Sequence, residues 1–217
     1  MKPRNNVQII LSTIVCLVPI VLTLALYKKL PEQVPIHFDM NGVPDNYASK
    51  AIAGFLFPVL LAAFNVFVHF MMNSDPKKQN ANKIIRLVGF WIFPVVSLIT
   101  VPMTLFKGLN YDVPVVTICT AMIGLLFLII GNYLPKSRQS YTVGIRLPWT
   151  LDNEENWNKT HRFGGFVWVL GGLVEIVSAF VRSYSIQFAV IALVVILPIA
   201  YSYLLFRKQI KDKEPKQ

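Results

Sequence analysis

Long runs of mainly apolar residues dominate the chain. They cover residues 7–26, 51–72, 84–106, 113–134, 163–181 and 186–206. At a rise of about 1.5 Å per residue, a helix of roughly 20 residues crosses the hydrocarbon core of a bilayer. The runs are continuous and lack the alternation of barrel strands. The pattern therefore predicts an all-α membrane protein with six transmembrane helices that form a single membrane domain over residues 1–217.

The lysines and arginines gather on one side of the predicted membrane. Six spans place both termini on the same side, and that side holds 16 of the 21 Lys and Arg residues. Because positively charged loops remain in the cytoplasm, we expect cytoplasmic termini, an external first loop at 27–50 and a cytoplasmic fourth loop at 135–162. Topology and contact with the lipid bilayer then account for the net charge of +10, and no direct binding of nucleic acid is expected.

Composition and motifs narrow the classes of function. Of the 217 residues, 54% are hydrophobic and 15% are charged, whereas soluble domains carry about 25% charged residues. The sequence has no P-loop, H-E-x-x-H, G-x-S-x-G or dinucleotide-binding glycine pattern, and no pair of membrane aspartates placed for proteolysis. We therefore expect a membrane protein that is not an enzyme and binds no cofactor.

The first loop has the pattern of an ordered hairpin. Apolar side chains alternate over residues 34–38 as in a short strand, and Asn41-Gly42 favours a tight turn because both residues tolerate positive φ. Ordered loops often carry binding residues, so this loop is a candidate binding surface.

Three polar side chains in the same loop offer an alternative interpretation. His37, Asp39 and Asp45 together contain donor atoms that a metal ion can use. Their spacing is irregular and only one of them is a histidine, so the signal is weak. We favour a polar loop surface and expect no metal site.

The fourth loop carries several local signals. Residues 141–146 can extend as a strand, and Asp152 to Glu155 have the spacing of a capping box. The capping box predicts a short amphipathic helix that begins at about residue 153. We expect this helix to lie on the inner membrane surface and to run towards the fifth span. Trp149 and Trp157 suit the membrane–water boundary. The loop is either a docking platform for a cytoplasmic protein or a lipid-anchored connector.

Glu175 is the only acidic residue within the six apolar runs. It belongs to a stripe at helical spacing that comprises Gly164, Trp168, Gly171, Glu175, Ser178 and Arg182. Small residues allow close helix contact, so we expect this stripe to face protein. An intramembrane carboxyl indicates function by default, here a small transporter or exporter that uses Glu175. The structural alternative is that Ser178 and Arg182 satisfy the carboxyl.

Other polar and proline positions within the spans have structural interpretations. Asn65 and His69 lie one helical turn apart, and we expect a packed, hydrogen-bonded histidine. Six prolines lie within or at the ends of the spans: Pro19, Pro58, Pro94, Pro102, Pro114 and Pro198. Each removes a backbone donor and can kink its helix, which a helix bundle tolerates when a neighbouring helix satisfies the freed carbonyl.

Two loop motifs together carry a resemblance to a known family. The first loop reads Leu30-Pro31…Val34-Pro35-Ile36-His37-Phe38…Gly42…Ser49-Lys50. The fourth loop reads Val143-Gly144-Ile145-Arg146-Leu147-Pro148-Trp149-Thr150-Leu151…Glu154-Glu155…Trp157…Thr160-His161-Arg162-Phe163-Gly164. The chain resembles the SdpI/YfhL family of bacterial integral-membrane immunity proteins, whose signature is G-[IL]-R-x-P-W-T-L. Leu147 stands where many relatives have Thr, which leaves the assignment intact.

The resemblance implies a multi-pass protein of the bacterial plasma membrane that protects the cell against a secreted, SdpC-type toxic peptide. Family precedent adds a second partner, a cytoplasmic autorepressor of the SdpR type that is sequestered at the membrane. Toxin binding outside would then shift the bundle so that the cytoplasmic loop captures the repressor. The candidate toxin- or partner-binding residues are His37, Phe38, Asp39, Gly42, Ser49, Lys50, Gly144, Arg146, Pro148, Trp149, Thr150, Trp157 and Arg162.

Overall fold

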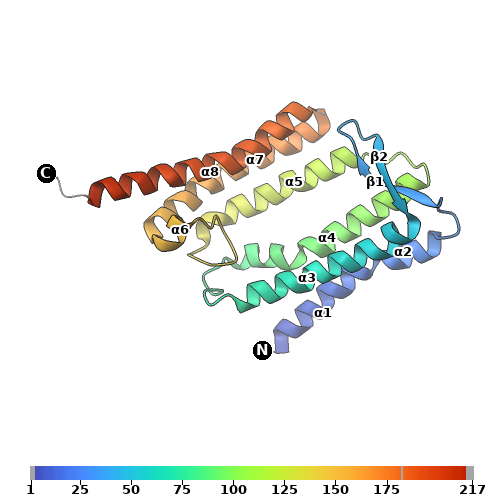
Figure 1. Ribbon diagram of the computed structural model, residues 1–217, viewed down its shortest axis with the longest axis horizontal. Helices are drawn as coiled ribbons and strands as arrows, with labels where there is room; N and C mark the ends of the chain where they lie inside the picture. Colours follow the sequence, from blue (N-terminus) through green and yellow to red (C-terminus); the bar gives the residue numbers. More distant parts are fainter. Residues whose placement is uncertain (1–2, 182, 214–217) are drawn as a thin grey trace. The chain divides into compact units, whose positions relative to one another are not determined.

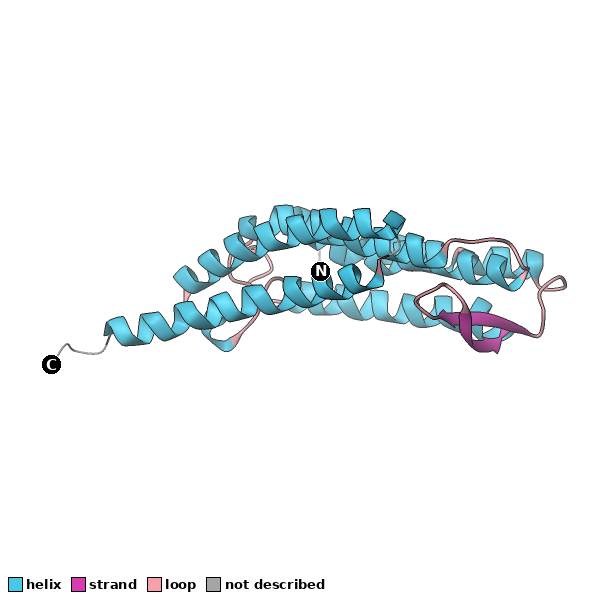
Figure 2. Ribbon diagram, turned by 90° about the horizontal axis from the view of Figure 1, so that it is seen from above, coloured by secondary structure: helices cyan, strands magenta, loops and turns pink. Residues whose placement is uncertain are grey.

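The computed structural model describes residues 3–181 and 183–213, with side chains for residues 6–181 and 183–212. The helices are α1 (Pro3–Leu17), α2 (Pro19–Leu26), α3 (Phe57–Ser74), α4 (Lys83–Gly108), α5 (Val115–Tyr133), α6 (Pro148–Asp152), α7 (Glu154–Val181) and α8 (Tyr184–Lys213). A π-helical turn, η1 (Ile52–Leu56), precedes α3, and a 3₁₀ turn, η2 (Leu134–Lys136), follows α5. The strands β1 (Gln33–Phe38) and β2 (Pro44–Ser49) form an antiparallel hairpin (Figures 1 and 2).

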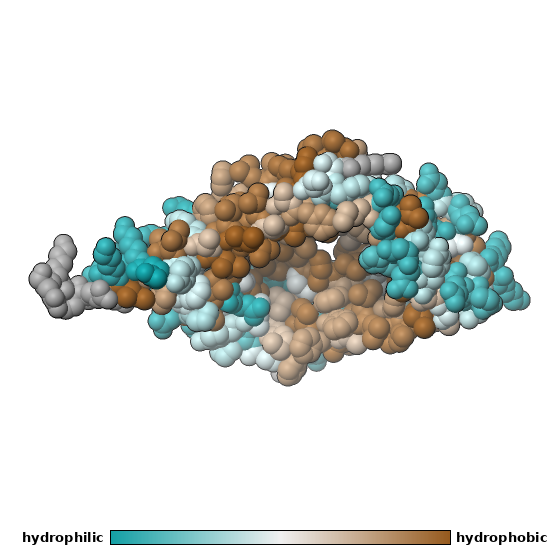
Figure 3. Space-filling model, turned by 45° about the horizontal axis from the view of Figure 1, so that its top comes forward, coloured by the Kyte–Doolittle hydropathy of each residue, from teal (hydrophilic) through white to brown (hydrophobic). Residues whose placement is uncertain are grey.

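Within the part of the chain that the structure describes, six helical segments are long and apolar enough to cross a membrane, which confirms the predicted number of spans. They are Asn6–Leu26, Ile52–Ser74, Lys83–Gly108, Val115–Lys136, Glu154–Val181 and Tyr184–Asp212. Hydrophobic residues cover the helices on the visible face, and hydrophilic residues gather near helix ends (Figure 3). The side on which each loop lies stays a prediction from the charge distribution.

The chain divides into two compact units, and each is described by itself. The first unit contains Met1–Met71 and Leu87–Val116, and the second contains Met72–Arg86 and Thr117–Gln217. The first unit therefore holds the hairpin, and the second holds the 135–162 loop with α7 and α8. Both α3 and α4 contribute residues to each unit.

In the first unit, a threonine compensates for a proline in the neighbouring helix. Pro58 has no N–H to donate to the carbonyl of Gly54 four residues earlier. The Thr23 hydroxyl of α2 donates to that carbonyl at 3.1 Å. A Cβ at Gly54 would lie 2.2 Å from the Thr23 methyl, so the glycine allows this close approach. As predicted, a neighbouring helix supplies a donor to the carbonyl that the proline leaves without its helical hydrogen bond.

In the second unit, a tryptophan plays the corresponding role. Pro198 of α8 leaves the Val194 carbonyl without its helical donor, and the Trp168 indole N–H of α7 donates to it at 2.9 Å. Gly171 also packs against Val194, where a Cβ would lie 2.4 Å from a Val194 methyl. Gly164 lies against Pro198. The predicted stripe on α7 thus faces protein, namely α8, over these residues.

A second glycine face of α7 packs against α5, and the sequence analysis does not predict it. The glycines are Gly124 and Gly131 on α5 and Gly165 and Gly172 on α7. A Cβ at any of them would lie within 2.6–2.9 Å of a backbone carbonyl oxygen of the other helix. Replacement by alanine would therefore push the two backbones apart.

The hairpin is fixed to the helices of the first unit by a small apolar core. Leu30 and Val34 pack with Ala53, Val101 and Leu105, and all five side chains are buried. An isolated two-stranded hairpin is marginal in water, so burial of β1 on the helices keeps this hairpin ordered. The predicted hairpin is confirmed, with Gln33 paired to Ser49 at its base.

Candidate functional site

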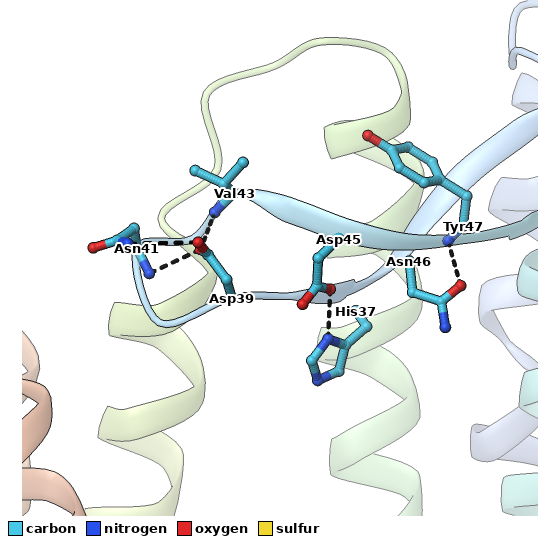
Figure 4. Close-up of polar contacts among 7 residues, drawn as sticks. All are labelled: His37, Asp39, Asn41, Val43, Asp45, Asn46 and Tyr47. Atoms are coloured by element: carbon cyan, nitrogen blue, oxygen red, sulfur yellow. Dashed lines mark hydrogen bonds and ion pairs between the residues drawn. The ribbon is translucent and has the colours of Figure 1, made fainter.

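The tip of the hairpin is closed by one carboxylate. Asp39 Oδ1 accepts hydrogen bonds from the backbone N–H groups of Asn41 at 2.8 Å and Val43 at 2.7 Å (Figure 4). Gly42 has φ of +76°, a conformation that glycine adopts without steric cost. Asp39 and Gly42 therefore shape the turn, and the half-buried Phe38 leads into it.

The polar residues of the hairpin perform separate structural tasks. His37 Nδ1 lies 2.5 Å from Asp45 Oδ1, and both side chains are largely exposed (Figure 4). Asp39 is engaged in the turn instead. Among the described residues, no group of three His, Cys, Asp or Glu side chains is placed to hold a metal ion. The hairpin therefore presents an exposed polar pair, His37–Asp45, as its surface feature.

The base of the hairpin is joined to the next helix. Ser49 Oγ accepts a hydrogen bond from the Ile52 N–H at 3.3 Å, at the start of η1. Lys50 Nζ lies 3.1 Å from Glu32 Oε1 and 4.8 Å from the centre of the Tyr27 ring. Ser49 and Lys50 thus hold the strand ends in register, and Ser49 is exposed while Lys50 is half-buried.

In the second unit, Asp75 organises the 135–162 loop. Its Oδ2 accepts hydrogen bonds from the Ser140 hydroxyl at 2.7 Å, the Thr142 hydroxyl at 2.8 Å, and the N–H groups of Tyr141 and Thr142 at 3.0 Å. Its Oδ1 accepts from the Lys77 N–H at 2.7 Å. The side chain is buried. Since two backbone N–H groups point inward to one carboxylate, residues 141–146 form an irregular loop, and the predicted strand is wrong.

The environment of Asp75 sets its protonation. Burial acts to raise its pKa, but hydrogen bonds from Ser140, Thr142 and the backbone N–H of Lys77 outweigh burial and lower the pKa below its ordinary value of 3.8. Asp75 is therefore ionised at neutral pH and anchors the loop as an anion.

A glycine and two aromatic rings form the centre of the same loop. Gly144 has φ of +112°, and a Cβ there would lie 2.4 Å from His161 Nε2 and 2.8 Å from the Trp157 ring. The Trp157 and His161 rings stack with centres 3.9 Å apart. His161 Nε2 accepts from the Ile145 N–H at 2.9 Å, while Nδ1 lies 2.8 Å from the Trp157 carbonyl. Because a carbonyl only accepts, Nδ1 carries the proton and the ring is neutral.

Pro148, Trp149 and Thr150 begin α6 (Pro148–Asp152) and attach the loop to α8. Pro148 occupies the first helical position, and the buried Thr150 hydroxyl donates to the Ile145 carbonyl at 2.9 Å and accepts from the Leu147 N–H at 2.9 Å. The Trp149 indole N–H donates to Ser202 Oγ at 2.8 Å. Trp149 and Thr150 are therefore scaffold rather than free surface, whereas Pro148 is exposed.

Asn156 and Thr160 of α7 extend this contact with Ser202 of α8. Asn156 Oδ1 accepts from the Ser202 hydroxyl at 2.9 Å and the Thr160 hydroxyl at 3.0 Å, and Asn156 Nδ2 donates to the Ser202 carbonyl at 3.1 Å. All three side chains are fully buried. Every polar group that the network buries has a hydrogen-bond partner, so the network favours this one arrangement of the side chains over others.

The structure corrects the predicted short helix of the fourth loop. The helix begins at Glu154 and continues without a break to Val181, so it is the first part of α7. Asn153 rather than Asp152 caps it, with its Oδ1 accepting from the Asn156 N–H at 2.9 Å. Trp157 is fully buried and donates to the Ser137 carbonyl at 2.8 Å, so its ring packs inside the protein and does not lie on the membrane surface as an exposed aromatic anchor.

The exposed candidates in this loop are few. Arg146 and Pro148 are exposed, and Arg146 donates to the Tyr141 carbonyl at 2.6 Å. Arg162 is exposed on α7. Of the candidate binding residues in this loop, Arg146, Pro148 and Arg162 therefore have side chains able to contact a partner, and Tyr141 beside them is 48% exposed.

Glu175 is buried at 1% exposure on α7. Ser178 donates its hydroxyl to the Glu175 backbone carbonyl at 2.8 Å, not to the carboxylate. Among the described residues, Glu175 Oε2 has no hydrogen-bond partner. Arg182, the other predicted partner, lies outside the described residues.

The polar residues of the second span form a buried cluster in the first unit. Ser12 Oγ lies 2.9 Å from His69 Nε2 and accepts from Asn65 Nδ2 at 2.8 Å. The His69 ring stacks on Phe90 with centres 4.2 Å apart. The prediction of a packed, hydrogen-bonded histidine is confirmed.

Sequence reasoning missed Asp75, Asn156, His161 and Ser202 as organising residues. Asp75 follows directly on an apolar run, in Asn73-Ser74-Asp75-Pro76, and an acid at a helix end is the available signal. The other residues could not be connected, because their partners lie far along the chain or belong to different helices.

The fold and these clusters define a multi-pass, all-helical membrane protein with two ordered polar loops. Residues 136–202 match the SdpI/YfhL protein family, and residues 14–62 match a domain of unknown function, DUF1648. Over 192 residues the chain is 27% identical to immunity protein SdpI of Bacillus subtilis (strain 168), which covers 88% of this chain and 91% of that protein. No solved structure matches.

These matches confirm the resemblance to the SdpI/YfhL family that the loop motifs indicate. The chain is a multi-pass protein of the cell membrane. The DUF1648 match contains the hairpin, and the SdpI/YfhL match contains α6, α7 and Ser202. Each ordered loop thus lies within a region shared with relatives. The named relative is an immunity protein.

Proposed function

We propose that this chain is an immunity protein that protects the cell against a secreted, SdpC-type toxic peptide. The observation that carries the proposal is its 27% identity with immunity protein SdpI over 88% of the chain. The hairpin supports it, because the charge distribution predicts that this loop faces the outside, where a secreted peptide arrives. The hairpin is ordered before binding, so little ordering entropy would oppose the contact.

We further propose that the 135–162 loop sequesters a cytoplasmic autorepressor of the SdpR type. Its scaffold, held by Asp75 and Thr150, is rigid, while Arg146, Pro148 and Arg162 extend from it. Coupling of the two loops requires that toxin bind two states of the protein with different affinities. The transport alternative is not favoured, since the named relative is an immunity protein.

Survival of toxin-sensitive bacteria tests the first proposal. Cells that express the intact chain should survive exposure to an SdpC-type peptide, and His37→Ser/Asp45→Ser should reduce survival because it removes the exposed pair of the hairpin. Lys208→Ser, an exposed change on α8, is the matched control and should protect fully. Absence of protection by the intact chain at normal membrane abundance would refute the immunity proposal.

Localisation of a fluorescent SdpR-type repressor tests the second proposal. The intact chain should recruit the repressor to the membrane when toxin is present. Arg146→Ser/Arg162→Ser should reduce recruitment while toxin protection persists, and Lys211→Ser on the exposed face of α8 serves as control. Recruitment that is equal for all variants would remove the 135–162 surface from the proposal.

A further inference from the structure

An open groove lies beside the hairpin within the first unit. Its volume is about 740 Å³, which is in the range of ligand pockets. Three pieces of chain line it: the segment from Lys29 to Pro35, strand β2, and residues 107–112, which comprise the end of α4 and the turn after it. Two of these three pieces belong to the first loop, which the charge distribution places outside.

The walls of the groove are fixed by tight packing. A Cβ at Gly108 would lie 2.7 Å from a Val34 methyl, so β1 packs directly on the backbone of α4. Helix α4 ends in a Schellman motif: Asn110 has φ of +63°, and the Tyr111 N–H donates to the Phe106 carbonyl at 3.0 Å. The Phe106 and Tyr111 rings meet edge to face at 5.6 Å. The groove is thus preformed.

The charges of the groove are not balanced internally. Lys29 and Lys107 line it together with a single acid, Asp112. The ion pairs of the described residues are His37–Asp45, Lys50–Glu32 and Lys159–Glu155. The nearby acids Glu32 and Asp45 are thus engaged with other side chains, and neither groove lysine takes part in a pair. Tyr47 and Tyr111, which are 50% and 61% exposed, add aromatic surface.

We propose that this groove binds a carboxylate-bearing segment of the secreted peptide. Lys29 and Lys107 pair with the carboxylate, and Tyr47 and Tyr111 pack on its neighbouring side chains. Hydrogen bonds between ammonium and carboxylate are stronger than those between neutral groups, and tyrosine offers a large contact area at low entropic cost. The assignment rests on the proposed immunity function and names the chemistry that the hairpin surface recognises.

Peptide binding to the full chain in phosphatidylcholine nanodiscs tests this assignment, with a labelled SdpC-type peptide as the probe. Lys29→Gln/Lys107→Gln should weaken binding at least about tenfold, because a charge-assisted contact is lost. Lys29→Arg/Lys107→Arg should retain most of the affinity, which separates loss of charge from loss of folding. Lys28→Gln alters an exposed lysine outside the groove lining and should bind like the intact chain.

The outcomes separate the groove from the function. If the intact chain and Lys29→Gln/Lys107→Gln bind the peptide equally, the groove assignment is overturned while immunity stands. If the intact chain does not bind the peptide, both are overturned. A lysine effect that appears only with phosphatidylglycerol in the nanodiscs assigns these lysines to lipid and also overturns the proposal.

Two peptide variants identify the carboxylate. Amidation of the peptide's C-terminus, or replacement of its acidic side chains by amides, should reproduce the loss of affinity seen with Lys29→Gln/Lys107→Gln. A peptide modified in this way should bind Lys29→Gln/Lys107→Gln no more weakly than it binds the intact chain. If neither peptide change weakens binding, no carboxylate is recognised and the proposal fails.

Discussion

At the scale of single residues, Gly144 and Asp75 determine the path of the 135–162 loop. Gly144 combines positive φ with the absence of space for a Cβ, and Asp75 replaces the hydrogen bonds that a strand would have provided. Both residues act through the backbone, so their substitution affects the whole loop and not only one contact.

Gly144→Ala should lower the free energy of unfolding by about 2–4 kcal/mol, because it adds the cost of positive φ to a steric clash with His161 and Trp157. Thermal or denaturant unfolding in detergent measures this change. Gly42→Ala is the matched control: its φ is also positive, but the nearest atom to a Cβ is a Val116 methyl at 3.6 Å, so only about 1–2 kcal/mol should be lost. Equal losses would contradict the packing argument.

Because of Asp75, the second unit should become less stable as the pH falls into the acidic range. Its pKa is lowered by folding, so its contribution is complete above 3.8, the ordinary value, and is lost as pH falls through the lower pKa of the folded state. The protection factors of the Tyr141 and Thr142 amides, which compare their hydrogen exchange with the intrinsic exchange rate at the same pH, should therefore fall at low pH. Asp75→Asn should lower these factors already at neutral pH and remove this pH dependence, whereas the exposed Asp152→Asn should change neither.

At the scale of elements, prolines and side-chain donors on adjacent helices form pairs. Pro58 is matched by Thr23, and Pro198 by Trp168, each through the carbonyl that the proline leaves without a donor. The helices α2 and α7 thus stabilise the irregular helices beside them, and glycines permit the close approach.

A double-mutant cycle tests the pairing of α7 and α8. Trp168→Phe keeps an aromatic ring but removes the indole donor, and it should cost about 1–3 kcal/mol by leaving the Val194 carbonyl unsatisfied. Pro198→Ala restores a helical N–H to that carbonyl, so Trp168→Phe should cost less in this background. Additive effects in denaturant unfolding would show that the indole hydrogen bond and the proline are independent.

At the scale of the whole molecule, the two ordered loops belong to different compact units that share α3 and α4. The hairpin leads through η1 into α3, and Asp75 follows the end of α3 directly. The chain itself therefore links the hairpin with the residue that anchors the 135–162 loop. Signalling by the proposed mechanism requires a change of state in this connection.

Glu175→Gln separates immunity from transport. We expect this isosteric change to leave toxin protection unchanged, because binding by the hairpin does not use the buried carboxyl. A transporter that needs its charge or proton would lose activity instead. Survival under toxin exposure at equal membrane abundance is the measurement, with Glu154→Gln, on an exposed residue at the start of α7, as control. Loss of protection specific to Glu175→Gln would revive the transport alternative.

The sequence by itself determined the six spans, the hairpin and the resemblance to the SdpI/YfhL family. Apolar length and local turn chemistry depend on residues that are neighbours in the chain, so they can be read without a structure. The stripe that includes Gly164 and Gly171 could be predicted for the same reason, since helical spacing alone places these residues on one face.

Only the tertiary structure decided which loop residues are scaffold and which are surface. Trp157 and Thr150 look like binding candidates in the motif, but both are fully buried, whereas Arg146 is exposed. Asp75 reaches Ser140 across 65 positions, and Asn156 reaches Ser202 across 46. Such hydrogen bonds depend on how helices pack, and the packing brings together residues that no local pattern connects.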